Sequence, residues 1–253
     1  MSSDPPLIEV RDLHQRFGDQ HVLRGVSTHV NKGETLVLLG GSGGGKSVLI
    51  KHFIGLLSPY SGQVIVNGED ISEMNERRLG GVRQAMGMMF QNGALFDFMT
   101  VGQNIAFPLR ERGVKDEQEI ERRVLESLEI VKLPGQESKM PAELSGGMRK
   151  RVALARAIVD KPECVLYDEP HAGLDPITGD SIDHLIKDLQ QNHGITNVII
   201  THEMRSVFRI ADRVIFLKKG QIYWEGTPTE MKESGDPELL DFINGVAREG
   251  AQV

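Results

Sequence analysis

The sequence is poor in cysteine and has no long apolar run. Cys164 is the only cysteine among 253 residues, which excludes an internal disulfide or a cysteine metal cluster and indicates a reducing compartment. No stretch approaches the roughly 20 apolar residues that a bilayer-spanning helix needs. Residues 1–11 also lack the basic and apolar segments of a secretory signal. These absences predict a cytoplasmic protein.

Basic residues are fewer than acidic ones. The chain has 29 lysines and arginines against 36 aspartates and glutamates, a net charge of −7. This balance argues against a general nucleic-acid binder, which needs a basic face to neutralise phosphates. Hydrophobic residues at 39% and charged residues at 26% are ordinary for a globular protein. The length suits one domain, or one core with an inserted sub-domain.

Short β-branched runs alternate with helical patterns along the chain. The expected strands are Leu7–Val10, Val22–Val30, Thr35–Leu39, Gln63–Val66, Met86–Phe90, Val165–Tyr167, Asn197–Ile200 and Arg213–Leu217. Amphipathic helices are expected over 116–131 and 178–191, and another over 237–247 needs a partner surface. Turn-rich hairpins are expected around Asn67–Gly68 and Lys219–Gly220. The alternation predicts an α/β fold with a largely parallel sheet.

The segment from about Asn92 to Asp160 differs from the rest, because its pattern is almost entirely helical. Its expected breakers are Pro108, Gly113, Pro134 and Pro141. We therefore expect a helical sub-domain inserted into the α/β core.

A glycine-rich loop directly follows the expected strand Thr35–Leu39. Its residues are Gly40, Gly41, Ser42, Gly43, Gly44, Gly45, Lys46 and Ser47, and a helix-compatible run begins at Val48. A loop wrapped around phosphates points several N–H groups inward, and only glycine takes the required dihedrals freely. The helix N-terminus adds partial positive charge. Lys46 then neutralises the β- and γ-phosphates and the Ser47 hydroxyl binds Mg²⁺, so the loop predicts a nucleoside triphosphate site.

A buried strand pattern ends in two carboxylates, Asp168 and Glu169, followed by Pro170. Asp168 is predicted to reach the Mg²⁺ shell, because a hard cation prefers oxygen ligands. Glu169 is predicted to face the attacking water as general base or orienting group. Alone the pair would indicate a solvated acidic turn, but beside a phosphate loop the catalytic interpretation is favoured.

The segment Leu144-Ser145-Gly146-Gly147-Met148 opens an expected helix. Together with the two motifs above it resembles the signature motif of ABC transporter ATPases. The resemblance runs in one unbroken order over about residues 7–230. It implies that Phe17 stacks on adenine beside Val22. It further identifies the family's Q-loop glutamine, D-loop aspartate and switch histidine as Gln91, Asp175 and His202.

The resemblance implies a complete fold and site. The fold is an α/β P-loop NTPase (RecA-like) core over 1–91 and 161–230 with an antiparallel β sub-domain, an inserted α-helical sub-domain over 92–160, and a C-terminal helix and tail over 231–253. The implied catalytic residues are Glu169, His202, Lys46 and Gln91. The implied ATP-binding residues are Phe17, Val22, Gly40, Gly41, Ser42, Gly43, Gly44, Gly45, Lys46, Ser47 and Val48, and the implied Mg²⁺ ligands are Ser47, Gln91 and Asp168.

The signature motif implies a dimer. Ser145, Gly146 and Gly147 begin a helix and form a second phosphate site. In the family this site meets ATP held by the opposite subunit. Two head-to-tail copies would therefore bury two ATP molecules between them and reopen after hydrolysis.

A finer resemblance points to the Mla/Mce-type ATPases of bacterial phospholipid traffic. It rests on the segments 90–97 and 104–111, on Met148 in the signature motif, and on the tail residues 242–245. It implies permease subunits, an Mce-domain lipid-binding protein, a small regulatory subunit, and a position on the cytoplasmic side of the inner membrane. Apolar residues that could anchor a permease helix, or form sub-domain core, are Leu95, Phe96, Phe98 and Met99.

Two other functions stay open, namely an importer ATPase for another solute such as amino acids and a soluble ABC protein without a permease. The helix over 237–247 could dock on its own chain, on its twin or on a regulator. Met148, Gly41, Gly44 and His171 depart from the commonest family residues. None of these departures removes a side chain that contacts phosphate or metal.

Overall fold

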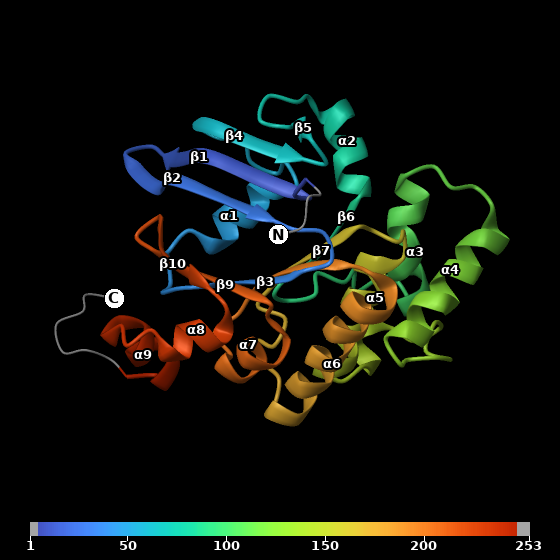
Figure 1. The fold of residues 1–253 in the computed structure, drawn as a ribbon. Coiled ribbons are helices and arrows are strands. Elements are labelled where there is room, and N and C mark those ends of the chain that lie inside the picture. The colour runs from blue at the N-terminus through green and yellow to red at the C-terminus, as the bar shows by residue number, and fades with distance from the viewer. Residues whose placement is uncertain (1–4, 247–253) are drawn as a thin grey trace. The chain divides into compact units, whose positions relative to one another are not determined.

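The computed structural model describes residues 5–246, which form two compact units (Figure 1). The first unit comprises the described residues up to Arg83 and those from Val198 onward, and the second comprises Gln84–Asn197. Helix α2 (Glu76–Gln84) leads into the second unit, and strand β8 (Thr196–Ile200) leads back to the first.

An antiparallel sheet forms one part of the first unit. Its order is β2-β1-β4-β5, which confirms the predicted antiparallel β sub-domain. The strands are β1 (Ile8–Phe17), β2 (Gln20–Val30), β4 (Ser61–Val66) and β5 (Glu69–Asp70). Asn67 and Gly68, both with positive φ, make the predicted tight turn between β4 and β5.

A second set of strands in the first unit carries the glycine-rich loop. Strand β3 (Thr35–Leu39) pairs in parallel with β9 (Arg213–Lys218), which pairs antiparallel with β10 (Gln221–Gly226) across the predicted hairpin at Lys219 and Gly220. All five residues of β3 are buried, as the uninterrupted apolar run predicts. The unit's other helices are α1 (Lys46–Phe53), α7 (Met204–Ile210), α8 (Pro228–Glu233) and α9 (Pro237–Asn244).

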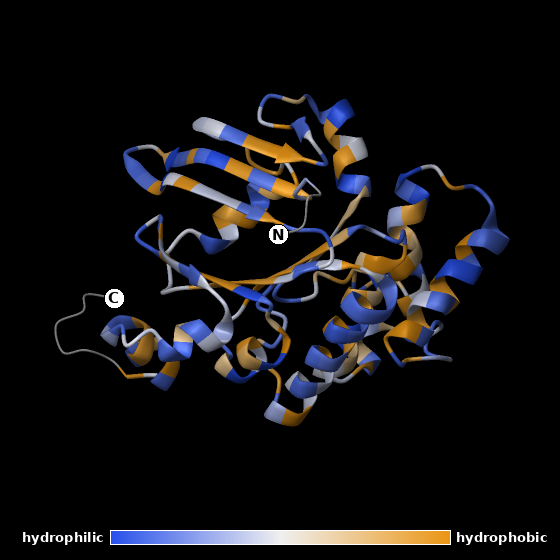
Figure 2. Cartoon of the chain, viewed as in Figure 1, coloured by the Kyte–Doolittle hydropathy of each residue, from blue (hydrophilic) through white to orange (hydrophobic). Residues whose placement is uncertain are grey.

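The second unit contains most of the helices. Strand β6 (Met86–Met89) pairs in parallel with β7 (Cys164–Asp168). The helices are α3 (Val101–Glu111), α4 (Glu117–Ile130), the 3-10 turn η1 (Pro141–Glu143), α5 (Gly146–Ile158) and α6 (Pro176–His193). In Figure 2, α4 and α6 alternate hydrophilic and hydrophobic residues along their lengths. Their predicted apolar stripes are buried, including Ile120, Val124 and Leu128 of α4.

Helix starts explain why these elements begin where they do. Side-chain oxygens cap most of the longer helices: Thr100 for α3, Asp116 for α4, Ser145 for α5, Asp175 for α6 and Asp236 for α9. Helix α1 differs, because its N-cap is Gly45, which offers no side-chain hydrogen bond. The first N–H groups of α1 therefore receive no side-chain cap.

Some sequence expectations were wrong. Pro108 lies inside α3 and does not break it. It sits in the last turn, where its missing N–H removes a single helical bond and Glu111 ends the helix anyway. The sequence patterns also missed β5, β10, α2, α7 and α8, which are short or polar. The predicted helical sub-domain, 92–160, lies within the second unit, and its boundaries stay a prediction.

No helix among residues 5–246 is both long and apolar enough to span a bilayer.

Asn104 organises the segment between β6 and α3. Its side chain is fully buried. Its Oδ1 accepts the Phe96 N–H at 2.7 Å, and its Nδ2 lies 3.0–3.1 Å from the carbonyls of Phe96, Met99 and Thr100. One amide thus satisfies backbone groups that have no strand or helix partner.

We expect Asn104→Ala to lower the free energy of unfolding by about 2–4 kcal/mol, because it leaves these backbone groups unpaired. Asn192→Ala is the matched control: Asn192 is exposed and donates only to Asp188, so its loss is expected to stay within about 0.5 kcal/mol. Urea denaturation measures both. Equal losses in the two variants would refute the anchoring role of Asn104.

Candidate functional site

The loop between β3 and α1 can be built only with glycine at particular positions. Gly40 has φ 135°, and a Cβ there would lie 2.0 Å from the Leu217 carbonyl oxygen. Gly45 has φ 98°, and a Cβ there would lie 2.7 Å from Leu23 Cδ2. Both positions therefore exclude side chains twice, by dihedral and by space.

Gly41 and Gly44, where the family more commonly has other residues, carry no positive φ. A Cβ at Gly41 would meet nothing within 4 Å. Glycine at these two departures from the family pattern is thus not required by a left-handed backbone.

Lys46 begins α1 and is 6% exposed. Its Nζ donates to the carbonyls of Gly40 at 2.7 Å and Gly41 at 2.9 Å. Ser47 and Val48 follow, both half-buried. A buried ammonium and a helix start without a side-chain cap thus belong to one glycine loop, an arrangement suited to a phosphate group.

Two apolar residues that the sequence assigns to adenine lie on the antiparallel sheet of the same unit. Phe17 ends β1 and is 48% exposed, so a face of its ring is available for stacking. Val22 is half-buried in β2, and its carbonyl would lie 3.2 Å from a Cβ built on Gly45. Val22 therefore borders the phosphate loop.

His202 follows β8 and is exposed. Its ring centroid lies 6.3 Å from that of Phe242 in α9, and Phe242 packs edge-on against Phe216 of β9 at 4.9 Å. Helix α9 is further held by an ion pair between Glu238 and Lys218. Its Leu239 is fully buried. Residues 237–244 therefore dock on their own chain, one of the three alternatives; Ala247 lies outside the described residues.

In the second unit, Asp168 ends β7 and Glu169 follows with φ 51°. Such a φ is uncommon for a residue with a side chain and marks a strained position. Lys150 of α5 donates to the Glu169 carbonyl at 3.4 Å and to the Gln91 carbonyl. Burial lowers the pKa of Lys150. Gln91 itself is exposed, just after β6.

The signature residues start α5. Ser145 is the N-cap, and its Oγ accepts the Met148 N–H at 3.2 Å. At Gly147 a Cβ would lie 2.4 Å from Thr178 Cγ2, so only glycine allows α5 to approach α6 this closely. Gly146 starts the helix.

Asp175 caps α6, and the hydroxyl of Thr178 donates to Asp175 Oδ2 at 2.5 Å. This hydrogen bond lowers the pKa of Asp175. His171, the departure after Pro170, pairs with Asp183 of α6 at 2.7 Å, and both side chains are nearly buried. The segment between β7 and α6 is therefore held at both ends.

The sequence family of the chain can now be decided. The model of the ABC transporter family matches residues 23–172. This chain belongs to the ABC transporter family. It is the ATP-binding subunit type of that family, and it is an ATPase.

Several relatives resemble this ABC ATPase over most of its length. The intermembrane phospholipid transport ATP-binding protein MlaF of Haemophilus influenzae is 39% identical over 94% of this chain and 90% of its own. The trigalactosyldiacylglycerol 3 protein of Arabidopsis thaliana is 38% identical over 94% and 74%. The probable ribonucleotide transport protein mkl of Mycobacterium leprae is 41% identical over 94% and 69%. The methionine import protein MetN of Brucella abortus is 42% identical over 89% and 61%.

Solved ATP-binding cassettes share the fold. A dimeric cassette in a post-hydrolysis state with ADP and Pi superposes with a TM-score of 0.80 at 29% identity, covering 87% of this chain and 98% of that one. The predicted P-loop α/β fold class is thereby confirmed.

The structure gathers the predicted site residues within each unit of the cassette. In the first unit the loop from Gly40 to Val48 is bordered by Val22. In the second, Gln91 and Glu169 share Lys150, and the signature residues adjoin the start of α6. The sequence patterns missed Lys150 and Arg156, because basic residues on a helix ordinarily face solvent.

The predicted metal ligands suit magnesium by donor type. Ser47, Gln91 and Asp168 offer a hydroxyl, an amide and a carboxylate oxygen, the hard donors that Mg²⁺ prefers. Within residues 5–246 no three His, Cys, Asp or Glu side chains gather into a metal cage. A magnesium ion here would therefore keep waters and phosphate oxygens in its shell, as this ion commonly does.

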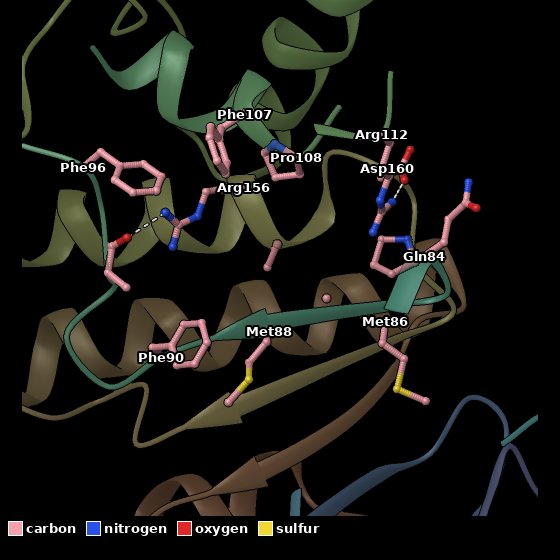
Figure 3. Close-up of a pocket in the computed structure, with 14 residues that line it drawn as sticks. Gln84, Met86, Met88, Phe90, Phe96, Phe107, Pro108, Arg112, Arg156 and Asp160 are labelled. Atoms are coloured by element: carbon pink, nitrogen blue, oxygen red, sulfur yellow. Dashed lines mark hydrogen bonds and ion pairs between the residues drawn. The ribbon is translucent and has the colours of Figure 1, made fainter. Parts of the chain in front are cut away.

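An apolar cavity of about 400 Å³ lies in the second unit (Figure 3). Met88 and Phe90 line one side, and Phe96 and Phe107 line the other. Phe96 and Phe107 contact each other with ring centroids 4.9 Å apart. Of the four apolar residues proposed as anchors, Phe98 is 76% exposed, whereas Leu95, Phe96 and Met99 are half-buried.

Gly40→Ala and Gly41→Ala form a matched pair for the loop. We expect Gly40→Ala to cost about 2–5 kcal/mol and to abolish ATP binding, because the new Cβ collides with the Leu217 carbonyl. Gly41→Ala should keep both stability and ATP affinity. Thermal denaturation and titration with a fluorescent ATP analogue measure these effects, and loss of binding in both variants would contradict the steric argument.

Proposed function

We propose that this ABC ATPase drives phospholipid transport between membranes as part of an Mla/Mce-type transporter. The observation that carries the proposal is the match to MlaF, which spans 94% of this chain and 90% of that protein. Similarity to a protein named after trigalactosyldiacylglycerol adds a second lipid-related relative. The ATPase would act on the cytoplasmic side of the inner membrane, bound to permease subunits.

A solute importer is the second candidate, and one comparison favours it. MetN is 42% identical, slightly more than MlaF, but the match takes only 61% of MetN. The relative mkl is named for ribonucleotide transport. Percentage identity does not separate these substrates. The extent of the MlaF match and Met148 in the signature motif favour lipid transport.

At the nucleotide, we assign the triphosphate to the loop Gly40–Ser47 and adenine to Phe17 and Val22. Lys46 would exchange its carbonyl partners for phosphate oxygens, which costs little because both are hydrogen-bond acceptors. Magnesium, held through Ser47, Gln91 and Asp168, would neutralise charge that develops on the phosphates.

Hydrolysis in this proposal depends on Glu169 and His202. The Glu169 carboxylate accepts a hydrogen bond from the attacking water and orients it toward the γ-phosphate. His202 donates a hydrogen bond to the γ-phosphate and so senses whether that group is present. Both residues act by positioning and charge, which dominate phosphoryl transfer.

We further propose that two copies close head to tail around two ATP molecules. Ser145, Gly146 and Gly147 of one copy would contact the ATP of the other, with Asp175 beside them. The start of α5 supports this, because a helix N-terminus attracts phosphate. Dimeric cassettes among the solved relatives support it as well. Loss of the γ-phosphate would weaken this bridge and reopen the pair.

The permease would dock at the apolar cavity of the second unit. Exposed Phe98 and half-exposed Phe90 offer apolar anchors at or near its rim for an amphipathic helix. An Mce-domain lipid-binding protein and a small regulatory subunit would complete the complex. No group in this chain is assigned to lipid contact or to nucleic acid.

Glu169→Gln should bind ATP normally and hydrolyse it about 10²- to 10⁴-fold more slowly, because the amide cannot act as a base. The variant should accumulate as a dimer in the presence of ATP, with its partners present. Single-turnover kinetics and size-exclusion chromatography measure these two results. A solely monomeric Glu169→Gln variant with bound ATP would refute the proposed dimer.

Lys46→Ala should fail differently, by weakening ATP binding about 10- to 100-fold through loss of a charge-assisted contact. Lys51→Ala, on the last turn of the same helix, is the control and should leave ATP affinity unchanged within about twofold. Equilibrium binding of a fluorescent ATP analogue distinguishes them.

The transport proposal is tested by purifying the tagged full chain from its native membranes in mild detergent. Mass spectrometry should find a polytopic permease, an Mce-domain protein and bound phospholipid. A permease recovered with a solute-binding protein would instead support the importer, and no membrane partner would overturn the transporter proposal. Phe98→Glu should reduce permease recovery while leaving the ATPase activity of the isolated chain intact.

A further inference from the structure

Helix α5 directs two buried cations at backbone carbonyls far away in the sequence. Lys150, 7% exposed, donates from Nζ to the carbonyls of Gln91 and Glu169. Arg156, further along the helix, donates to the carbonyls of Gly93 and Ala94 at 2.7 Å each. Figure 3 shows the guanidinium of Arg156 turned toward the strand-to-helix segment that contains Ala94. One helix therefore contacts the segments that follow both β6 and β7.

The contacted segments contain two strained residues. Glu169 has φ 51° and Ala94 has φ 47°, left-handed values that are uncommon for residues with a Cβ. A carbonyl of each is bound by a cation of α5. Such conformations persist only when the surroundings hold them, and they cluster at functional sites. The Glu169 carbonyl also accepts the Ala172 N–H at 3.1 Å, which alone leaves room for a second donor.

The same helix begins with the signature residues. Ser145 caps α5 and Lys150 lies about one turn into it. Helices transmit displacement as rigid elements, so a shift of Ser145 would move the Lys150 ammonium with it. Burial disfavours the charged form of Lys150, and its carbonyl contacts offset part of that cost.

We propose that Lys150 is a positioning residue for hydrolysis. It holds the backbone of Glu169 and Gln91 in place relative to the signature helix, and it touches neither ATP nor water itself. The inference rests on the proposed function, in which Glu169 and Gln91 act at the γ-phosphate. It adds to that function a link by which contact at Ser145 reaches the catalytic glutamate of the same chain.

Lys150→Met tests the link, because it removes the donors and keeps most of the side-chain volume. We expect kcat for ATP hydrolysis by the full chain to fall about tenfold, with KM and ATP affinity unchanged within about twofold. Lys150→Gln keeps an N–H donor without the charge and should recover part of kcat. Lys115→Met, at an exposed lysine between α3 and α4, should change nothing.

Hydrogen exchange supplies a readout that does not depend on activity. Lys150→Met should speed amide exchange over residues 90–96 and 168–174, relative to Lys115→Met, while the melting temperature of the whole chain shifts little. Unchanged exchange in both segments, or a rise of KM with kcat intact, would overturn the positioning role.

A double-mutant comparison separates this inference from the proposed function. In a Glu169→Gln background, Lys150→Met should cause no further loss in single-turnover hydrolysis. A full tenfold further loss would show that Lys150 acts independently of Glu169 and would overturn the inference. If Glu169→Gln itself hydrolyses ATP normally, the proposed role of Glu169 fails, whereas the exchange result still decides whether Lys150 holds that backbone.

Discussion

The close approach of Gly40 to the Leu217 carbonyl is the constraint on which the nucleotide site depends. Parallel pairing of β3 with β9 brings Leu39 opposite Phe216, so the chain must leave β3 directly beside the end of β9. Any Cβ at Gly40 would occupy the position of the Leu217 oxygen. From that turn the loop folds back so that Lys46 reaches the Gly40 and Gly41 carbonyls. The phosphate loop is therefore a consequence of strand pairing as much as of its own glycines.

The end of β9 also supports the C-terminal helix. Phe216 is buried beneath Phe242 of α9, and Phe242 in turn lies near His202. The ion pair of Lys218 with Glu238 and the hydrogen bond from Tyr223 to Asp236 fasten the start of α9 to the β9–β10 hairpin. Strand β9 thus contacts the phosphate loop at one residue and the helix beside the switch histidine at its neighbours.

In the second unit, buried cations take the part that backbone pairing takes in the first. The segments after β6 and β7 have few regular hydrogen bonds, and Asn104, Lys150 and Arg156 satisfy their carbonyls instead. A polar side chain in this role leaves the backbone free to adopt the left-handed conformation at Glu169. The catalytic carboxylate is thereby presented by strain that the surrounding helices maintain.

The sequence by itself determined the elements whose signals are local. The loop Gly40–Ser47, the apolar strands and the capped starts of α4, α5 and α6 are encoded within a few residues each, because dihedral preferences and periodicity act over short distances. The order of these motifs was enough to predict the family. Only the tertiary structure decided the docking of α9 on its own chain, the helical position of Pro108 and the contacts of Lys150. Lys150 and Gln91 are 59 positions apart, and no local pattern records which distant carbonyl a buried cation will find.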